Sequence, residues 1–179
     1  MNESMPQQAP VVETRNPQPH LVFDPSWCRA CKVCEMACSS LKEGQARPAV
    51  ARINVFFDEF AEDAPISAML CFHCADAPCL AACPTEAMSR HPITGAVLID
   101  EAKCVGCMLC RRACPWDVPK RHPDRRVAIK CDLCSDRAAG PYCVQVCPLS
   151  GRALRHEPGS NGESQPEIIT RRKTGKREV

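Results

Sequence analysis

Residues 104–115 read CVGCMLCRRACP, in which four cysteines stand at intervals of two, two and three residues and a proline follows the last. The chain carries this grouping four times, with the middle interval widened in two of the groups. The four groups are Cys28, Cys31, Cys34, Cys38; Cys71, Cys74, Cys79, Cys83; Cys104, Cys107, Cys110, Cys114; and Cys131, Cys134, Cys143, Cys147. Together they contain all 16 cysteines of the chain.

The spacing indicates which metal these cysteines bind. A zinc ribbon uses two C-x2-C pairs and needs no third cysteine two residues further on. The run C-x2-C-x2-C-x3-C-P is the bacterial ferredoxin signature for [4Fe–4S] clusters, and its fourth cysteine binds the neighbouring cluster. Proline follows the fourth cysteine in three groups, but Ser39 follows Cys38, so Cys38 departs from the motif. At four thiolates per cluster, 16 cysteines predict four [4Fe–4S] clusters with none left over.

The rest of the composition is poor in core-forming residues. Leu, Ile, Val and Phe together number 34 of 179 residues, which is near the level at which a chain cannot bury enough apolar surface to fold. The length suits one compact domain or two small intertwined ones. We therefore expect cluster binding to be coupled to folding.

Several classes of protein are disfavoured. The N-terminus, MNESMPQQAPVVETRNPQPH, has no basic start, apolar run or twin arginine, and no stretch reaches the eighteen apolar residues of a membrane span. We therefore expect a cytoplasmic chain with reduced thiols, which argues against disulfides. A net charge of +2 argues against nucleic-acid binding. No dinucleotide fingerprint, P-loop or C-x3-C-x2-C run is present, so we expect catalysis to belong to another chain.

The order of the groups suggests an α+β fold of two bacterial-ferredoxin-like modules, one inserted into the other. Residues 71–114 form the inserted module with groups two and three, and residues 26–70 plus 115–155 form the discontinuous module with groups one and four. The expected elements are a short helix at Cys79–Pro84, a turn at Pro92–Gly95, and strands at Ala87–Arg90, Ala96–Asp100, Arg52–Phe57 and Arg126–Lys130. Gly106, inside the third group, predicts a close backbone approach to its cluster.

The two ends differ in composition from the cysteine-bearing part. Residues 1–25 contain five prolines and predict an extended arm, and residues 156–179 predict a polar tail with a basic run at Arg171–Arg177. Such a tail is either solvated or a strap across a partner protein, and both interpretations stay open.

Three segments resemble a known family. They are Cys114-Pro115-Trp116-Asp117-Val118-Pro119, Lys130-Cys131-Asp132-Leu133-Cys134 and Cys143-Val144-Gln145-Val146-Cys147-Pro148. Over residues 20–155 the chain resembles the four-cluster ferredoxin-like subunits of molybdenum and tungsten oxidoreductases. That family includes subunits of dimethyl sulfoxide reductase, formate dehydrogenase and polysulfide reductase, and soluble relatives serving hydrogenases, carbon monoxide dehydrogenase and aldehyde oxidoreductases.

The resemblance implies a crossed set of ligands. One cluster would be held by Cys28, Cys31, Cys34 and Cys147; its neighbour by Cys131, Cys134, Cys143 and Cys38; a third by Cys71, Cys74, Cys79 and Cys114; and the fourth by Cys104, Cys107, Cys110 and Cys83. In the family the clusters lie in a file along which electrons tunnel, so the resemblance implies a non-catalytic electron-transfer subunit.

The partner is implied in the same way. The favoured one is the catalytic subunit of a tungsten or molybdenum pterin enzyme, an aldehyde oxidoreductase, with a flavin or NAD subunit as a further partner. Carbon monoxide dehydrogenase, hydrogenase and formate dehydrogenase are alternatives, and so is an independent soluble ferredoxin. A redox-sensing regulator is disfavoured because no nucleic-acid-binding motif is present.

The sequence also predicts supporting roles for a few residues near the cysteines. Trp27 and Trp116 are expected to shield clusters from water, and His73 is expected to be an exposed or hydrogen-bonding loop residue. Two charged patches are either solvated surface or docking surfaces, including ones for head-to-tail self-association. The basic patch comprises Arg111, Arg112, Lys120, Arg121, Arg125, Arg126 and Lys130, and the acidic patch comprises Asp58, Glu59, Glu62 and Asp63.

Overall fold

The computed structural model describes residues 18–61 and 65–159, which form short helices and two-stranded antiparallel sheets. The helices are α1 (Val33–Glu43), α2 (Pro78–Ala81), α3 (Leu109–Ala113) and α4 (Tyr142–Gln145), with a 3-10 turn at Pro48–Val50. The sheets pair β1 (His20–Phe23) with β8 (Leu154–Glu157), β2 (Asn54–Phe57) with β3 (Ile66–Met69), β4 (Met88–Arg90) with β5 (Val97–Ile99), and β6 (Lys120–Arg121) with β7 (Ala128–Ile129). This is the expected mixture of α and β structure.

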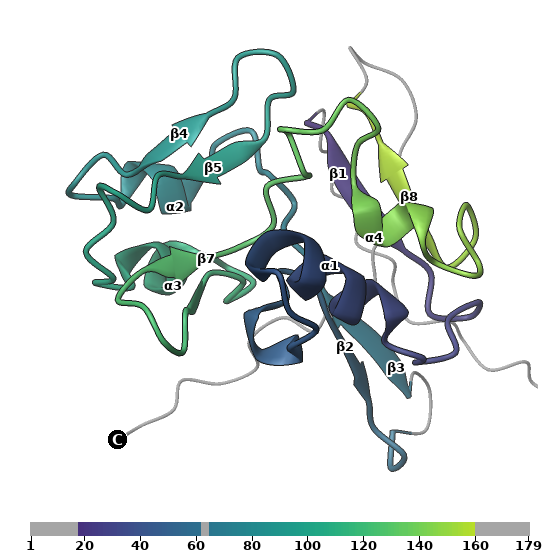
Figure 1. The fold of residues 1–179 in the computed structure, drawn as a ribbon. Coiled ribbons are helices and arrows are strands. Elements are labelled where there is room, and N and C mark those ends of the chain that lie inside the picture. The colour runs from purple at the N-terminus through teal and green to yellow at the C-terminus, as the bar shows by residue number, and fades with distance from the viewer. Residues whose placement is uncertain (1–17, 62–64, 160–179) are drawn as a thin grey trace, which may run out of the picture.

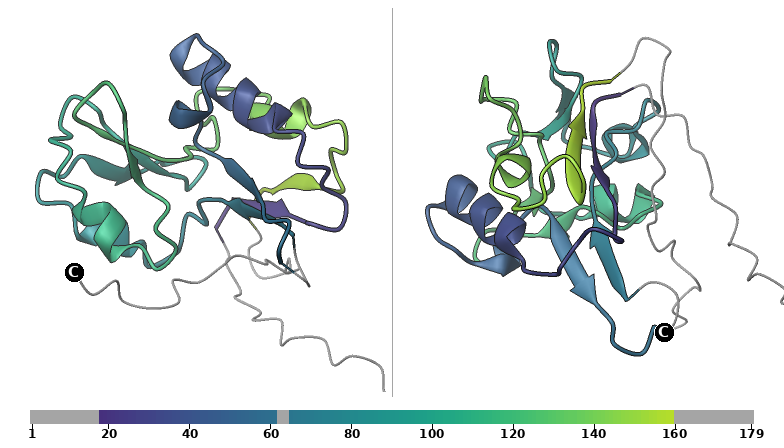
Figure 2. Two further views of the ribbon diagram at one scale, coloured as in Figure 1. Left: turned by 90° about the horizontal axis from the view of Figure 1, so that it is seen from below. Right: turned by 90° about the vertical axis from the view of Figure 1, so that its right-hand side faces the viewer.

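The elements gather on two sides of the molecule. Helix α1 packs against α4, and α2 packs against α3. Figure 1 and the left panel of Figure 2 show α2, α3, β4 and β5 on one side, and α1, α4, β1 and β8 on the other. The first and last parts of the described chain are therefore neighbours, and the right panel of Figure 2 shows β1 and β8 side by side.

Each helix follows from the cysteine motif. The third cysteine of every group is the second residue of a helix, as Cys34 is in α1 and Cys143 in α4. In the first three groups the residue two positions earlier has a left-handed backbone (Lys32, Ala77 and Met108, at φ 60°, 36° and 63°), which turns the cysteine loop sharply into the helix. Proline then follows the fourth cysteine and prevents α2, α3 and α4 from continuing.

Helix α1 is the exception, because it has no such proline. It runs eleven residues, passes through Cys38 and Ser39, and ends at Gly44, whose φ of 70° suits a glycine. The serine that breaks the Cys-Pro pattern therefore marks a longer helix.

The predicted strands occur, and each is shorter than expected. Strands β4 and β5 lie within Ala87–Arg90 and Ala96–Asp100 and are joined by the expected turn, in which the Gly95 N–H donates to the His91 carbonyl. Strands β2 and β7 lie within Arg52–Phe57 and Arg126–Lys130. Their partners β3 and β6 were not predicted.

The limits of both terminal segments need correction. Strand β1 lies inside the range 1–25 that was expected to be an unpacked arm, yet all four of its residues are buried because they pair with β8. Strand β8 likewise extends into the range 156–179 as far as Glu157. The remaining parts of the predicted arm (1–17) and tail (160–179) lie outside the described residues.

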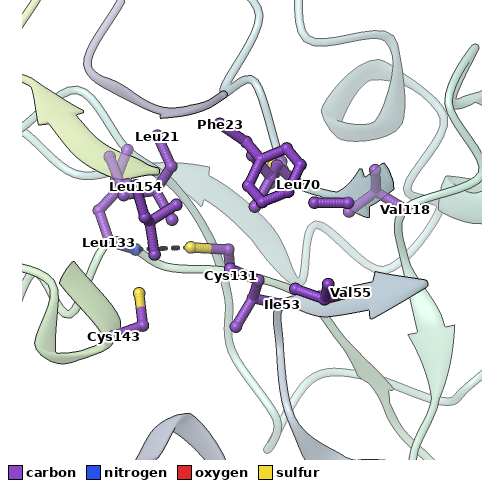
Figure 3. Close-up of a cluster of buried hydrophobic side chains, with 13 residues drawn as sticks. Leu21, Phe23, Ile53, Val55, Leu70, Val118, Cys131, Leu133, Cys143 and Leu154 are labelled. Carbon is purple, nitrogen blue, oxygen red and sulfur yellow. Dashed lines mark hydrogen bonds between the residues drawn. The ribbon is translucent and has the colours of Figure 1, made fainter. Parts of the chain in front are cut away.

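The main buried cluster mixes ordinary apolar side chains with cysteines (Figure 3). Leu21, Ile53 and Leu70 are almost fully buried, and they share the cluster with Cys71 and Cys131. The small core therefore includes cysteines of the metal-binding motifs and is not a separate apolar cluster. Among the described residues, no helix is long and apolar enough to cross a membrane.

Candidate iron–sulfur sites

All sixteen cysteines lie in the described part of the chain, and all are free thiols. Four of them, Cys28, Cys31, Cys34 and Cys147, line one cavity of about 140 Å³. One water molecule occupies roughly 30 Å³ in the liquid, so this cavity has room for a group of several atoms. The last cysteine of the fourth group therefore lies with the first three of the first group, 113 or more positions earlier in the chain.

A second cavity brings together Cys71, Cys74, Cys79 and Cys114. Its wall also includes Trp116, whose ring packs against Phe72 with a centroid separation of 4.9 Å. Cys114 comes from the third group and the other three cysteines from the second. The aromatic side chain beside them fits its expected role of shielding the thiols from water.

The other two sets of thiols are recognisable from their mutual influence and packing. Burial raises the pKa of Cys143, and the charges of Cys38 and Cys134 raise it further. Burial also raises the pKa of Cys131 well above its usual range, with a further contribution from Cys143. Cys38, although it belongs to the first group, packs against the same buried cluster as Cys131 and Cys143.

The remaining set is Cys83, Cys104, Cys107 and Cys110. Burial raises the pKa of Cys110 to about 11, and the charges of Cys79, Cys104 and Cys107 contribute, that of Cys79 most. Cys83 and Cys104 pack against the same buried cluster as Cys110.

Three pairs of thiols connect one set with the next. Cys34 adds to the raised pKa of Cys143, Cys71 to that of Cys131, and Cys79 to that of Cys110. Packing agrees with this order: Cys34, Cys71, Cys131 and Cys143 belong to one buried cluster or pack against it, and Cys79 packs against the cluster that contains Cys110. The resulting order of sets, from the Cys28 set through the Cys131 and Cys71 sets to the Cys104 set, is here called the line.

Each end of this line contains one exposed cysteine, whereas every cysteine of the middle sets is buried or half-buried. Cys31, in the first set, and Cys107, in the last, are the two exposed cysteines. The middle sets contain Cys71, Cys131 and Cys143, all of them buried. The thiols at the two ends are therefore more accessible than those of the middle sets.

The thiols are suited to binding metal and not to remaining ionised on their own. Burial raises the pKa of Cys34 to about 12 and that of Cys74 to about 11. Such thiols keep their protons at neutral pH unless a metal replaces them. We therefore expect cluster assembly to release protons.

Backbone N–H groups point at several cysteine sulfurs. The N–H groups of Ala30, Arg52 and Ala128 donate to Cys28, Cys38 and Cys104 Sγ at 3.4, 3.3 and 3.3 Å. Leu133 N–H donates to Cys131 Sγ at 3.4 Å, the contact drawn in Figure 3. Hydrogen bonds to sulfur stabilise the thiolate and are among the factors that set cluster potentials.

An ion-pair network surrounds Asp132, which lies between Cys131 and Cys134. Lys42 Nζ is 2.8 Å and Arg52 Nη1 is 3.1 Å from its carboxylate. Burial alone would raise the pKa of Asp132, but the two cations outweigh it and hold this pKa below its usual value. The charge next to the cysteines is thus balanced within the protein.

Some supporting residues differ from expectation. His73 is almost fully buried, and its Nδ1 accepts a 2.9 Å hydrogen bond from Val97 N–H, so the hydrogen-bonding alternative is correct and the exposed one is wrong. Trp27 is 41% exposed and lies under the Arg152 guanidinium, 4.4 Å from the ring centroid. It does not line the cavity of the Cys28 set.

The predicted basic patch is not one surface. Lys130 is buried, Arg111 pairs with Asp117, and Arg125 pairs with Glu43. Residues of one basic run in the sequence thus occupy different environments: some are buried, some form ion pairs, and others face solvent. Of the acidic patch, Asp58 and Glu59 follow β2, while Glu62 and Asp63 lie outside the described residues.

Among the described residues, no three Cys, His, Asp or Glu side chains gather closely enough to hold a single metal ion. A cubane does not require that arrangement, because each of its thiolates binds a different iron atom. The residues present fit such a group: four thiols converge on a cavity, apolar side chains line it, and N–H groups face the sulfurs.

Comparison with known proteins agrees with this chemistry. Residues 63–157 match the 4Fe-4S dicluster domain family. The polyferredoxin-like subunit of an aliphatic sulfonate oxidoreductase from Pyrococcus furiosus is 37% identical over 131 residues, covering 73% of this chain and 72% of the relative.

Two Escherichia coli proteins are similarly related. Formate hydrogenlyase subunit 2 is 34% identical over 168 residues, covering 75% of this chain and 80% of that protein. One of the polypeptides of anaerobic dimethyl sulfoxide reductase is 36% identical over 149 residues, covering 76% of this chain and 71% of that protein. The chain therefore belongs to the 4Fe-4S dicluster family and is an iron–sulfur electron-transfer protein.

Proposed function

We propose that the chain binds four [4Fe–4S] clusters and conducts electrons along them from one exposed end to the other. The observation that carries this proposal is the cavity in which Cys147 meets Cys28, Cys31 and Cys34, together with the packing of the other cysteines in adjoining buried clusters and the exposed cysteines, Cys31 and Cys107, in the first and last sets. Each cluster, when bound, accepts and passes on one electron at a time. The protein supplies the thiolates, the spacing and the exclusion of water from the middle.

The ligands are shared between groups in this proposal. The first set is completed by Cys147, the second by Cys38, the third by Cys114 and the fourth by Cys83, so the last cysteine of each group serves a cluster of another group. The shared cavities of Cys147 with Cys28 and of Cys114 with Cys71 support this assignment. So does the influence of Cys38 on Cys143.

The same sharing defines two ferredoxin-like modules. Groups one and four belong to one module, which is interrupted by the module of groups two and three. The packing of α1 against α4 and of α2 against α3 supports this division. Strand β7 crosses the division, since Ala128 packs with Val97 and Cys110 of the inserted module.

The proposed partner is a catalytic oxidoreductase subunit of the tungsten or molybdenum pterin class, with an aldehyde oxidoreductase favoured. Support comes from the relatives, whose names identify them as parts of sulfonate oxidoreductase, formate hydrogenlyase and dimethyl sulfoxide reductase. One exposed end of the line would face that subunit, and the other would face an electron acceptor or donor such as a flavin or NAD subunit.

The test is the metal content and mass of the native protein prepared without oxygen. We expect about sixteen iron and sixteen acid-labile sulfide per chain, since each cubane holds four of each. Native mass spectrometry should show the chain bound to a larger pterin-containing chain at fixed stoichiometry. Zinc without sulfide would overturn the cluster assignment, and a chain found only by itself would overturn the assignment as a subunit.

A further inference from the structure

Lys130 is a buried cation with an unusual environment. Its residue is only 4% exposed, and its Nζ donates to the Val97 carbonyl, to the Cys131 carbonyl at 2.9 Å and to Cys71 Sγ at 3.7 Å. An ammonium group has three hydrogen atoms to donate, and these three acceptors use all of them. Two of the acceptors are neutral carbonyls, so the sulfur is the only one that can carry negative charge.

Two other cations with largely buried side chains are balanced by a carboxylate. Lys42 and Arg52 both pair with Asp132, at 2.8 and 3.1 Å. No ion pair joins Lys130 to any described Asp or Glu. Burying a charge without an opposite charge is strongly unfavourable, so the partner of this ammonium must lie elsewhere.

The position of Lys130 identifies that partner. It lines the cavity of Cys71, Cys74, Cys79 and Cys114, and in sequence it precedes Cys131 of the adjoining set. Cys71 and Cys131 also belong to one buried cluster of side chains, so the two middle sets adjoin there. The ammonium therefore faces the junction between two buried, thiolate-rich sites.

We propose that Lys130 sets the potential of the middle of the line: its ammonium raises the reduction potential of the cluster held by the Cys71 set, and to a smaller extent that of the Cys131 set. This inference rests on the proposed cluster assignment. A cluster becomes more negative by one charge when it takes up an electron. Burial disfavours that added charge, whereas a fixed positive charge hydrogen-bonded to a ligand sulfur favours it. Lys130 would thus keep the water-excluded middle from becoming a barrier between the exposed ends.

The test replaces Lys130 and measures each cluster potential by anaerobic dithionite titration followed by paramagnetic resonance. Lys130→Met removes the charge and keeps most of the volume. We expect the Cys71-set cluster to become at least tenfold harder to reduce, a shift of about 59 mV to lower potential for one electron. The equilibrium constant for reduction of the Cys28-set cluster should change less than twofold.

Lys103→Met is the matched control. Lys103 immediately precedes Cys104, just as Lys130 precedes Cys131, but its side chain is 62% exposed. Water screens an exposed charge. This variant should therefore change the equilibrium constant for reduction of every cluster by less than threefold. Equal shifts in the two variants would overturn the proposal, as would unchanged potentials in a fully assembled Lys130→Met protein.

Lys130→Arg covers the case in which the Met variant does not assemble. If the ammonium balances cluster charge, arginine should restore both iron content and the Cys71-set potential toward wild-type values. If Met and Arg variants both fail to assemble, the role of Lys130 is shape and not charge, and the proposal is wrong. Full iron content with unchanged potentials would contradict this inference alone, whereas low iron content in the wild-type protein would contradict the proposed function.

Discussion

The Ser39 hydroxyl accepts a 3.0 Å hydrogen bond from the backbone N–H of Arg47, eight residues further along the chain. Its own proton reaches the carbonyls of Glu35 and Met36, each at 3.0 Å. Ser39 is fully buried, so these contacts satisfy groups that water cannot reach. The residue that breaks the Cys-Pro pattern thus ties α1 to the segment that returns toward Arg52.

Restoring the pattern should therefore damage the protein. Ser39→Pro removes a backbone donor in the middle of α1 and forces the proline ring against the preceding turn, at a cost of about 3 kcal/mol or more. Because Cys34 and Cys38 both lie in α1, we expect lower iron content as well as a lower midpoint of anaerobic thermal unfolding.

Ser39→Ala is the control for that experiment. It keeps the helix but leaves the partly buried Arg47 N–H without its acceptor, a loss of about 1 kcal/mol. Iron content should stay at the wild-type level. A proline variant as stable as the alanine variant would show that α1 does not need to continue past Cys38.

Local patterns in the sequence predict part of this structure. Pairings between distant segments cannot be predicted from such patterns. The cysteine and proline that bound Cys79–Pro84 predict a short helix there, which the structure places at Pro78–Ala81, and the strand pattern predicts β4 and β5, because these are local patterns. Helices α1, α3 and α4 were not predicted. Pairing of β1 with β8 is not local: His20 lies opposite Glu157, and nothing in either segment identifies the other. Sequence composition therefore made residues 20–23 look like part of an arm.

Charged residues were the other source of error. Lys130 lies in a basic stretch that suggests surface, and only its neighbours in space show that it is buried. Its place directly before Cys131 was the available signal. The ferredoxin motif specifies a crossed fourth ligand, and two cavities bring cysteines of different groups together in that way, Cys147 with Cys28 and Cys114 with Cys71. The full ligand assignment stays a prediction.

Gly106 allows a second prediction. Its φ is +64°, and a Cβ at this position would lie 2.6 Å from the Arg126 carbonyl oxygen, so the close approach is to backbone of the loop before β7. Gly106→Ala should lower the thermal midpoint and the iron content through both backbone strain and this clash. A left-handed alanine costs about 1–2 kcal/mol by itself, and the clash adds to it.

The matched variant is Gly140→Ala. Gly140 has a similar φ of +73°, but a Cβ there would have nothing within 4 Å, so only the backbone strain applies. We expect Gly106→Ala to be clearly the more damaging of the two. Equal effects would mean that the loop at Arg126 moves aside without cost.

Removing the clusters should unfold the chain. Leu21, Ile53 and Leu70 are buried in the same group of side chains as Cys71 and Cys131, so the small core depends on the metal-binding loops. After anaerobic chelation, we expect amide hydrogen exchange in β1 and β2 to rise to the rate of an unstructured chain. Protein treated with chelator but still showing full cluster absorbance is the control, and apoprotein with native protection would contradict the coupling of folding to cluster binding.

Crossed ligation is the central claim, and serine variants at four cysteines test it. Cys143 and Cys147 belong to the same sequence group but to different proposed clusters, as do Cys31 and Cys38. Replacing a cysteine ligand by serine shifts the potential of that cluster or converts it to a three-iron form. An anaerobic redox titration followed by paramagnetic resonance therefore identifies the cluster that each variant changes. Cys31→Ser supplies the reference for the Cys28-set cluster, and Cys143→Ser supplies it for the Cys131-set cluster.

The decisive measurement compares Cys147→Ser with those two references. Crossed ligation predicts that Cys147→Ser perturbs the cluster altered by Cys31→Ser and leaves the one altered by Cys143→Ser unchanged, while Cys38→Ser does the reverse. If Cys147→Ser instead perturbs the Cys143 cluster and Cys38→Ser the Cys31 cluster, each group binds its own cluster and the proposed arrangement is wrong.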